Sequence, residues 1–190
     1  MATYIMGAGV YAKAVYDAAV LNGIQVDGLA VSDTRCAGFN HIKVISEEEI
    51  VTDDRVILAI TDNRIRTLLF NELKMIKAKV LPIVHPTAWI SDNASIGEGS
   101  VILAGALINH SAICGKACII GTGAVLESDC ILEYGVNVGA RAVLATGVTV
   151  GSETTIGAGA VIASNVRIGK GCVIRPGEVV TSNVADGTGA

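Results

Sequence analysis

Residues 96–125 read IGEGSV-ILAGAL-INHSAI-CGKACI-IGTGAV, which is five six-residue units with no insertion between them. The same frame continues through seventeen units over residues 84–185. The first position of a unit is aliphatic in sixteen of them and is Cys114 in the other, while the fifth position is mostly small. A strict period of six does not return to one face of a helix, whereas short strands joined by turns accommodate it, and hexapeptide repeats are typical of parallel β-helices. The sequence therefore predicts a left-handed β-helix of between five and six three-sided coils.

The first eighty residues follow a different pattern, in which short apolar runs alternate with segments of helical spacing. This pattern predicts a βαβ unit followed by one more strand and helix. The expected fold class is an α/β half-Rossmann domain that binds a sugar nucleotide, over residues 1–80, followed by an all-β left-handed parallel β-helix over residues 81–190. The expected strands are residues 3–6, 26–31 and 55–60, the expected helices are residues 13–22 and 63–77, and residues 80–84 are expected to lead into the β-helix.

Charge and composition argue against several classes of protein. A net charge of −4 argues against a nucleic-acid surface. No apolar run approaches 18 residues, and no basic region precedes an apolar segment at the start, so neither a membrane helix nor a signal peptide is expected. Cys114, Cys118, Cys130 and Cys172 fall on interior positions, where they would act as small apolar fillers; metal binding by the first two is the alternative. Free buried thiols fit a reducing cytoplasm, which is the expected location.

A glycine-rich motif, Gly7-x-Gly9-x-x-Ala12, follows the first expected strand and opens the first expected helix. It matches the phosphate-binding fingerprint, and Asp33 follows at a suitable distance for a ribose contact. Amides at a helix start point toward a phosphate, and glycine lets the backbone approach it. Because about 80 residues supply too few strands for a full dinucleotide site, one nucleotide or a nucleotide-sugar is favoured over NAD. A turn that merely requires small residues is the alternative.

Several short segments, spread over nearly the whole chain, carry a resemblance to a known family. They are residues 7–9 with 12–13, 59–66, 84–88, 96–99, 121–125 and 156–161. Together they resemble the bacterial sugar acetyltransferases grouped with sialic acid O-acetyltransferase and with UDP-N-acetylbacillosamine-type (4-amino-sugar) N-acetyltransferase. Many acyltransferases share the hexad, but this set of motifs is specific to the group.

The resemblance implies a homotrimer with parallel β-helices, acetyl-CoA in the groove between neighbouring β-helices, and a nucleotide-sugar held by the N-terminal domain. It also implies a role in the assembly of surface polysaccharides or glycans. Carried over one residue at a time, the sugar-nucleotide contacts fall on Gly9, Val10, Tyr11, Ser32, Asp33 and Thr61. The acetyl-CoA contacts fall on Asn137, Ala158 and Pro176.

The chain departs from the family pattern at functional positions. The family's base is a histidine in an acidic-His-acidic-Cys segment, but residues 127–130 read Glu-Ser-Asp-Cys, so Ser128 stands in the histidine position. A second family histidine corresponds to Asn137, and the histidine usual in the first βα loop corresponds to Tyr11. Acetyl transfer needs a group that takes the proton of the nucleophile. Serine lacks the necessary basicity, and a carboxylate such as that of Asp129 is a weak base at neutral pH.

His110 offers a possible compensation. His110 and Ser128 are 18 residues apart, which is one full coil, and both occupy the third position of their units. They are therefore expected to stack on one face of the β-helix, about 5 Å apart at the backbone. In one interpretation His110 reaches into the groove as the base, with Ser128 as its hydrogen-bonding partner and Asp129 beside them as a third catalytic candidate. In the other, His110 is a surface or trimer-interface residue.

The sequence leaves two functions from different classes to compare. The first is an acetyl-CoA-dependent acetyltransferase that modifies an amino or hydroxyl group of a nucleotide-linked sugar. The second is a catalytically silent relative that binds a sugar nucleotide or a partner protein as a trimer. A zinc-dependent carbonic anhydrase of similar outline is not favoured, because only His110 of the three histidines lies well inside the repeat. No metal, nucleic-acid or membrane partner is expected.

Overall fold

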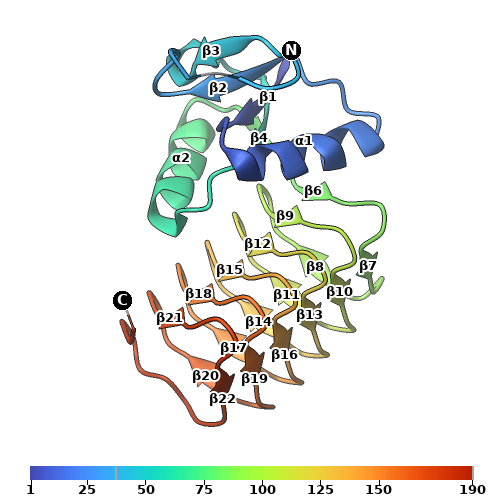
Figure 1. Ribbon diagram of the computed structural model, residues 1–190, viewed down its shortest axis with the longest axis vertical. Coiled ribbons are helices and arrows are strands. Elements are labelled where there is room, and N and C mark those ends of the chain that lie inside the picture. Colours follow the sequence, from blue (N-terminus) through green and yellow to red (C-terminus); the bar gives the residue numbers. More distant parts are fainter. Residues whose placement is uncertain (37, 190) are drawn as a thin grey trace.

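The computed structural model describes residues 1–36 and 38–189, and it consists of a small α/β domain beside a three-sided β-helix (Figure 1). The expected α/β fold of the first part and the expected β-helical fold of the second part are confirmed. The predicted boundary at residues 80 and 81 falls between the last strand of the α/β sheet and the first strand of the β-helix. Within the described residues, no helix is both long and apolar enough to span a membrane.

The α/β domain is a five-stranded parallel sheet with one helix on each face and the strand order β3-β2-β1-β4-β5. Alternate residues of the strands face opposite sides, so Ile5 and Ile57 pack with helix α1 while Met6 and Leu58 pack with helix α2. The elements are β1 (Thr3–Met6), α1 (Val10–Leu21), β2 (Gly28–Val31), β3 (Val44–Ser46), the short 3-10 helix η1 (Glu47–Glu49), β4 (Arg55–Leu58), α2 (Asn63–Met75) and β5 (Lys79–Val80).

Two strands of this sheet, β3 and β5, were not predicted. They contain three and two residues, which is too short for a recognisable period, and only their pairing with β2 and β4 makes them strands. The prediction that residues 80–84 lead directly into the β-helix was therefore wrong at Val80. Helix α1 begins at Val10, three residues earlier than expected, and β2 and β4 are shorter than expected.

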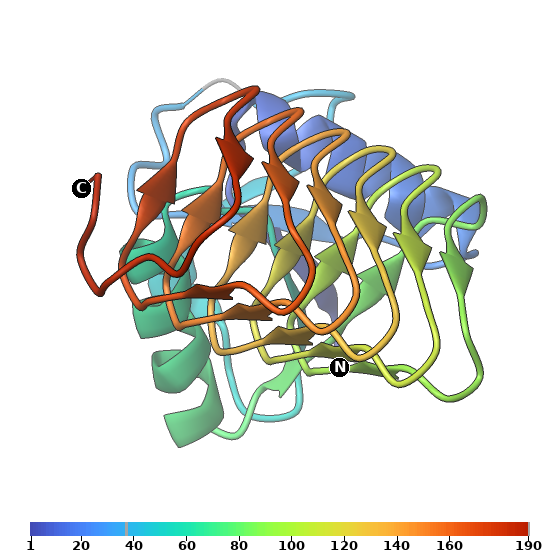
Figure 2. The same cartoon turned by 90° about the horizontal axis from the view of Figure 1, so that it is seen from below.

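The β-helix contains seventeen two-residue strands in three parallel sheets, which form three faces (Figure 2). The first face consists of β6 (Ile83–Val84), β9 (Val101–Ile102), β12 (Ile119–Ile120), β15 (Asn137–Val138), β18 (Thr155–Ile156) and β21 (Val173–Ile174). The second face consists of β7 (Trp89–Ile90), β10 (Leu107–Ile108), β13 (Val125–Leu126), β16 (Val143–Leu144), β19 (Val161–Ile162) and β22 (Val179–Val180). The third face consists of β8 (Ser95–Ile96), β11 (Ile113–Cys114), β14 (Ile131–Leu132), β17 (Thr149–Val150) and β20 (Arg167–Ile168).

The hexad explains this arrangement residue by residue. The first position fills the interior, as Ile120 and Leu144 do with no exposed surface, and the small fifth position packs beside it. From Gly99 to Gly177, the fourth position turns the corner in the left-handed region of backbone space, for example at Asp129 with φ 63°. At the second position the coils approach closely: a Cβ on Gly157 would lie 2.4 Å from the backbone nitrogen of Pro176. The residue pattern therefore follows from the stacking of coils.

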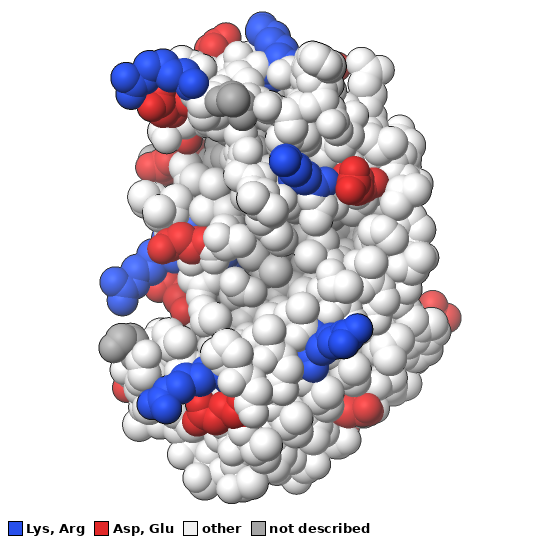
Figure 3. Space-filling view, viewed as in Figure 1, with Lys and Arg blue, Asp and Glu red and all other residues white. Residues whose placement is uncertain are grey.

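The α/β domain covers the beginning of the first face. The outward side chains of Ile83, Val101 and Ile119 are 2%, 0% and 3% exposed there, and Ile83 and Val101 belong to the apolar cluster that includes α1. Farther along the same face, the outward side chain of Val173 is 41% exposed. The domain thus sits over the first coils and leaves the rest of this face open beside it. On the side of the molecule drawn in Figure 3, charged side chains are scattered and do not gather in one patch.

Candidate active site

A cavity of about 510 Å³ opens at the carboxyl ends of β1 and β4, where the chain turns toward α1 in one direction and toward α2 in the other. Residues 7–11 and 59–62 line it. Ligands of open α/β sheets bind at such a switch point. Gly7 is required by its φ of 114°, and a Cβ there would lie 2.8 Å from the carbonyl oxygen of Ala59. Gly9 is the N-cap of α1 and provides no side-chain cap, so the amides of Val10 and Tyr11 remain free for an anion, whereas the amide of Ala12 donates to the carbonyl of Gly9.

A second cavity, of about 390 Å³, shares Gly7 and Ile60 with the first one. It continues between α2 and η1, on the face of the sheet that carries Met6 and Ala30. Its remaining lining residues are Val31, Ser32, Glu47, Ile65, Leu68, Leu69 and Glu72. We call this second cavity the α2 groove. The two cavities adjoin at Gly7 and Ile60 along the carboxyl edge of the sheet, and we call them together the cleft.

The structure brings most of the predicted sugar-nucleotide residues to this cleft. Gly9, Val10, Tyr11 and Thr61 line the first cavity, and Ser32 lines the α2 groove. Asp33 lies on an exposed turn, where its carboxylate accepts two 2.8 Å hydrogen bonds from the guanidinium of Arg35. These hydrogen bonds lower the pKa of Asp33. A ribose contact at Asp33 would have to exchange with Arg35.

Tyr11 occupies an unusual position in the first cavity. Its hydroxyl oxygen is buried and has no hydrogen-bond partner among the described residues. Burial raises the pKa of Tyr11 well above its ordinary value, and the nearby positive charge of Arg66 partly opposes this shift. The hydroxyl is therefore a neutral, buried donor without an acceptor among the described residues.

Arg66, which the sequence analysis did not single out, joins the cleft to the β-helix. Its side chain has no exposed surface and donates to the carbonyl oxygens of Ala117 and Gly135, both at 2.8 Å. It also donates to the carbonyls of Ile60 and Thr61, at 3.0 and 3.1 Å. Burial lowers its pKa, but a guanidinium stays charged in proteins. The only sequence signal was its place in the motif at residues 59–66, since a charged residue in a helix is normally expected in solvent.

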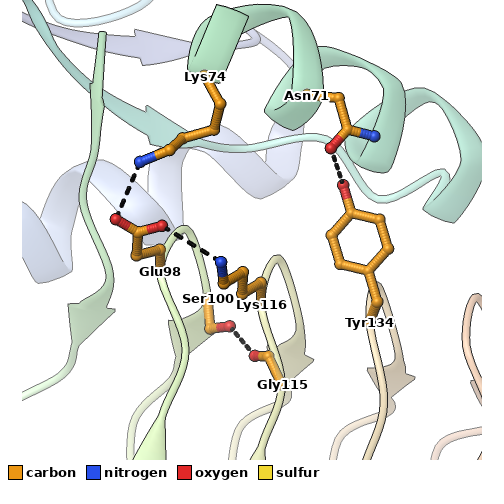
Figure 4. Close-up of polar contacts among 7 residues, drawn as sticks. All are labelled: Asn71, Lys74, Glu98, Ser100, Gly115, Lys116 and Tyr134. Carbon is orange, nitrogen blue, oxygen red and sulfur yellow. Dashed lines mark hydrogen bonds and ion pairs between the residues drawn. The ribbon is translucent and has the colours of Figure 1, made fainter. Parts of the chain in front are cut away.

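A second set of contacts holds α2 against the corner between the third and first faces (Figure 4). Glu98 lies between Lys74 of α2, at 3.0 Å, and Lys116 of the next coil, at 3.8 Å. The hydroxyl of Tyr134 donates to the carbonyl oxygen of Thr67, at 2.8 Å, and lies 3.2 Å from the Oδ1 of Asn71. Within the β-helix, the hydroxyl of Ser100 donates to the carbonyl oxygen of Gly115. The exposed ion pairs contribute little individually, so the buried contacts of Arg66 dominate the attachment.

The predicted acetyl-CoA residues lie along the first face and the corner that follows it. Asn137 is half-buried on β15, with its Nδ2 atom 3.5 Å from the carbonyl oxygen of Thr61. Ala158 and Pro176 are exposed at the corner, one coil apart. Ala140 precedes them by one coil in the same column and is also exposed. This column of small residues begins beside the sugar-nucleotide cleft and runs away from it.

The predicted catalytic residues lie elsewhere, at the corner between the second and third faces. His110 and Ser128 occupy successive coils as expected, and the amide of Asp129 donates to the carbonyl of His110 at 3.1 Å. The expectation that Ser128 is the partner of the His110 ring was wrong: the Nδ1 of His110 lies 2.8 Å from the hydroxyl of Ser111. The imidazole is exposed and reaches its own neighbour more easily than the next coil. In a three-sided rod this corner is opposite the first face, so one chain does not bring these residues to its own cleft.

The chain is therefore a left-handed β-helix protein of stacked hexads that carries an α/β domain on its first coils. Two protein families match the chain: residues 3–73 match the PglD N-terminal domain, and residues 147–181 match the bacterial transferase hexapeptide (six repeats). No curated protein sequence matches it.

Solved structures extend the match to the whole chain. A mutant of perosamine N-acetyltransferase from Caulobacter crescentus, in complex with CoA and GDP-perosamine, is 30% identical with a TM-score of 0.91 over 98% of this chain and 91% of its own. The acetyltransferase domain of PglB from Neisseria gonorrhoeae FA1090, in complex with acetyl coenzyme A, is 27% identical with a TM-score of 0.90 over 97% and 93%. The chain therefore belongs to the bacillosamine-type family of hexapeptide-repeat sugar acyltransferases, as its motifs predicted.

Proposed function

We propose that this protein is an acetyl-CoA-dependent acetyltransferase that modifies an amino or hydroxyl group of a nucleotide-linked sugar in surface-glycan biosynthesis. The observation that carries the proposal is the full-length similarity to perosamine N-acetyltransferase, which is solved with CoA and a GDP-linked amino-sugar. The cleft at the carboxyl edge of the sheet supports it. We further propose a cytoplasmic location, supported by the four buried free cysteines.

The residues of the cleft suggest how the sugar nucleotide is held. The amides after Gly9 carry the positive end of α1 and suit a diphosphate. Tyr11, which lines the same cavity, forms part of the wall beside the diphosphate. Thr61 lies between this cavity and Asn137, so the sugar extends from the α/β domain toward the first face and the adjoining corner.

The transfer itself requires a proton acceptor near the thioester. A lone pair of the sugar nitrogen or oxygen attacks the thioester carbonyl carbon, and the nucleophile loses a proton to a base. The tetrahedral intermediate then collapses, the carbon–sulfur bond breaks, and CoA leaves with a proton as the free thiol. His110 is the proposed base, because neutral imidazole accepts a proton near neutral pH. Ser128 and Asp129 line the same corner as the proposed polar surroundings of the acceptor.

A second copy of the chain is needed to complete this site. The corner that carries His110 lies opposite the first face, so its partner cleft must come from a neighbour, and we propose a homotrimer. The second face supplies a surface for assembly, because its outward side chains form an uninterrupted apolar column. The column consists of Trp89, Leu107, Val125, Val143, Val161 and Val179, of which Trp89 and Val179 are 53% and 66% exposed.

A thiol-release assay tests the activity directly. The wild-type protein should release CoA thiol from acetyl-CoA in the presence of a nucleotide-linked amino-sugar. His110→Ala should lower turnover at least tenfold, because a positioned general base raises the reaction rate by a factor of about 10²–10⁴. Unchanged turnover in His110→Ala would exclude this base. If no acceptor gives turnover, heat stability with each ligand distinguishes the enzyme from the catalytically silent alternative. A ligand at 100 times its dissociation constant raises the free energy of unfolding by about 2.7 kcal/mol. Stabilisation by nucleotide-sugars but not by CoA would contradict the enzymatic proposal.

Assembly is tested separately with Val143→Asp, at the middle of the apolar column. A buried unpaired carboxylate is costly, so the variant should sediment as a smaller species than the wild type. Thr149→Asp, on the outward side of the third face, is the matched control. A wild-type mass equal to one chain would contradict the trimer.

A further inference from the structure

The α2 groove has a lining that the acetyl-transfer chemistry does not use. Its floor is apolar, and two apolar side chains of α2 stand beside it with large exposed areas: Ile65 is 51% exposed and Leu68 is 57% exposed. Glu72 follows Leu68 by four residues on the same side of the helix. Glu47 of η1 faces the groove from the other wall. The groove therefore combines an apolar lining with two carboxylates, one from η1 and one from α2.

Neither carboxylate has an ion-pair or side-chain hydrogen-bond partner among the described residues. Glu47 and Glu72 have no ion pair and accept no side-chain hydrogen bond there, and no lysine or arginine lines the groove. Glu49, two residues from Glu47, is different, because its carboxylate accepts from the amide of Ser46 in a capping box. The carboxylates of Glu47 and Glu72 are thus free to accept hydrogen bonds from a ligand.

The position of the groove indicates which part of a ligand would enter it. It begins at Gly7, beside the free amides of α1, and passes Ser32 at the end of β2 before it reaches the carboxylates. A diphosphate at the amides places the ribose near Ser32 and the base in the groove, which is the order of ligand groups along such sheet edges. The volume of about 390 Å³ is within the range of small-molecule pockets.

The chemistry of the carboxylate selects among the bases. A carboxylate has two acceptor oxygens and no donor, so it is complementary to an edge that presents two adjacent N–H groups. Guanine presents such an edge at N1 and N2. Uracil presents one N–H between two carbonyl oxygens, and adenine and cytosine each present an amino group beside a ring acceptor, so their neighbouring acceptors repel the carboxylate.

We infer that the α2 groove is a guanine subsite and that Glu47 and Glu72 make this protein selective for GDP-linked sugars. This inference rests on the proposed nucleotide-sugar function and specifies its substrate class. The apolar floor stacks on the base, and the carboxylates read its N1–H and N2–H edge. Bidentate, charge-assisted hydrogen bonds are stronger than neutral ones. A site built for such bonds should bind guanine at least tenfold more tightly than a base that lacks the two donors.

Calorimetric titration of the full chain with GDP, UDP, CDP and ADP tests the inference without any catalytic readout. The wild type should bind GDP at least tenfold more tightly than UDP. Glu47→Gln and Glu72→Gln present one acceptor and one donor in place of two acceptors, so the double variant should lose at least tenfold in GDP affinity. Its UDP affinity should stay the same or rise, because an amide complements the N3–H and O4 of uracil. Glu48→Gln, whose carboxylate lies outside this cavity, is the matched control and should behave as the wild type.

The outcomes separate this inference from the proposed function. UDP binding as tight as GDP binding in the wild type would overturn the guanine subsite and leave the nucleotide-sugar function standing. A GDP preference that persists in the double variant would overturn the assignment to Glu47 and Glu72. If the wild type binds CoA but none of the four diphosphates, the nucleotide-sugar function fails and the subsite fails with it.

Discussion

The attachment of the α/β domain to the β-helix depends on one buried cation, and Arg66→Met tests this dependence. The substitution keeps an unbranched apolar side chain in the site but removes all five hydrogen bonds of the guanidinium. The carbonyl oxygens of Ala117 and Gly135 are buried and would lose their donor. The acceptors on Ile60, Thr61 and Asn63 are only partly buried and can recruit water.

The size of the effect follows from these two classes of acceptor. A buried acceptor left without a donor costs about 1–3 kcal/mol, and partly buried acceptors cost less. The substitution also removes the cost of burying a charged guanidinium, and this gain partly offsets the lost hydrogen bonds. We therefore expect Arg66→Met to lower the free energy of unfolding by about 3–5 kcal/mol, which is typical of a broken buried polar network. Arg66→Lys should be intermediate, since it keeps the charge but loses the planar fork.

Urea denaturation followed by circular dichroism measures this loss, at fixed protein concentration because assembly contributes to stability. Arg64→Met is the matched control: Arg64 is exposed two residues earlier on α2, and its substitution should change stability by less than about 0.5 kcal/mol. A loss below about 1 kcal/mol for Arg66→Met would mean that water replaces the guanidinium. The description of Arg66 as the attachment between domain and β-helix would then be wrong.

Two further predictions concern the β-helix. Gly157→Ala should destabilise it by about 2–3 kcal/mol in urea denaturation, because the new Cβ would lie 2.4 Å from the backbone of Pro176 and the coils must separate. Gly159→Asn should cost no more than about 1 kcal/mol, because Gly159 has nothing within 4 Å and asparagine tolerates its φ of 68°; equal losses at the two sites would contradict the stacking argument. Burial raises the pKa of Cys130 from 9.0 to about 11, so the unfolded chain ionises this thiol at lower pH than the folded chain. The resulting stability is full below pH 9 and is lost as the pH rises through about 11. The urea midpoint of the wild type should therefore fall more steeply over this interval than that of Cys130→Ala, and parallel curves would refute the assignment.

Much of the β-helix could be predicted from the sequence because each hexad repeats one local conformation. The aliphatic first position, such as Ile120, must face inward in every coil, and a spacing of 18 residues sets which residues stack. The α/β domain was less predictable. β3 and β5 have too few residues for a period, and they become strands only where β2 and β4 offer hydrogen-bonding edges.

The candidate site, like the fold, could be predicted only in part from the sequence. The glycine motif predicted the turn that lines the first cavity, because only glycine permits the φ of Gly7 and the close approach of its backbone to Ala59. Phosphate binding at this turn stays a prediction. Glu47 and Glu72 gave no signal, since charged residues in helices are normally solvated and their convergence depends on how α2 packs beside η1. The His110 ring was also assigned the wrong partner, because the stacking interval does not decide which neighbour a flexible side chain reaches.

The sequence by itself determined the three-sided rod, its interior and the register of its coils, since these depend on contacts that recur every 18 residues. Only the tertiary structure decided where the α/β domain sits, because the attachment joins residues far apart in the chain. Arg66 reaches Ala117 and Gly135 across separations of 51 and 69 residues. That placement sets the cleft on the first face, opposite His110, and for this reason the proposed reaction needs a neighbouring copy.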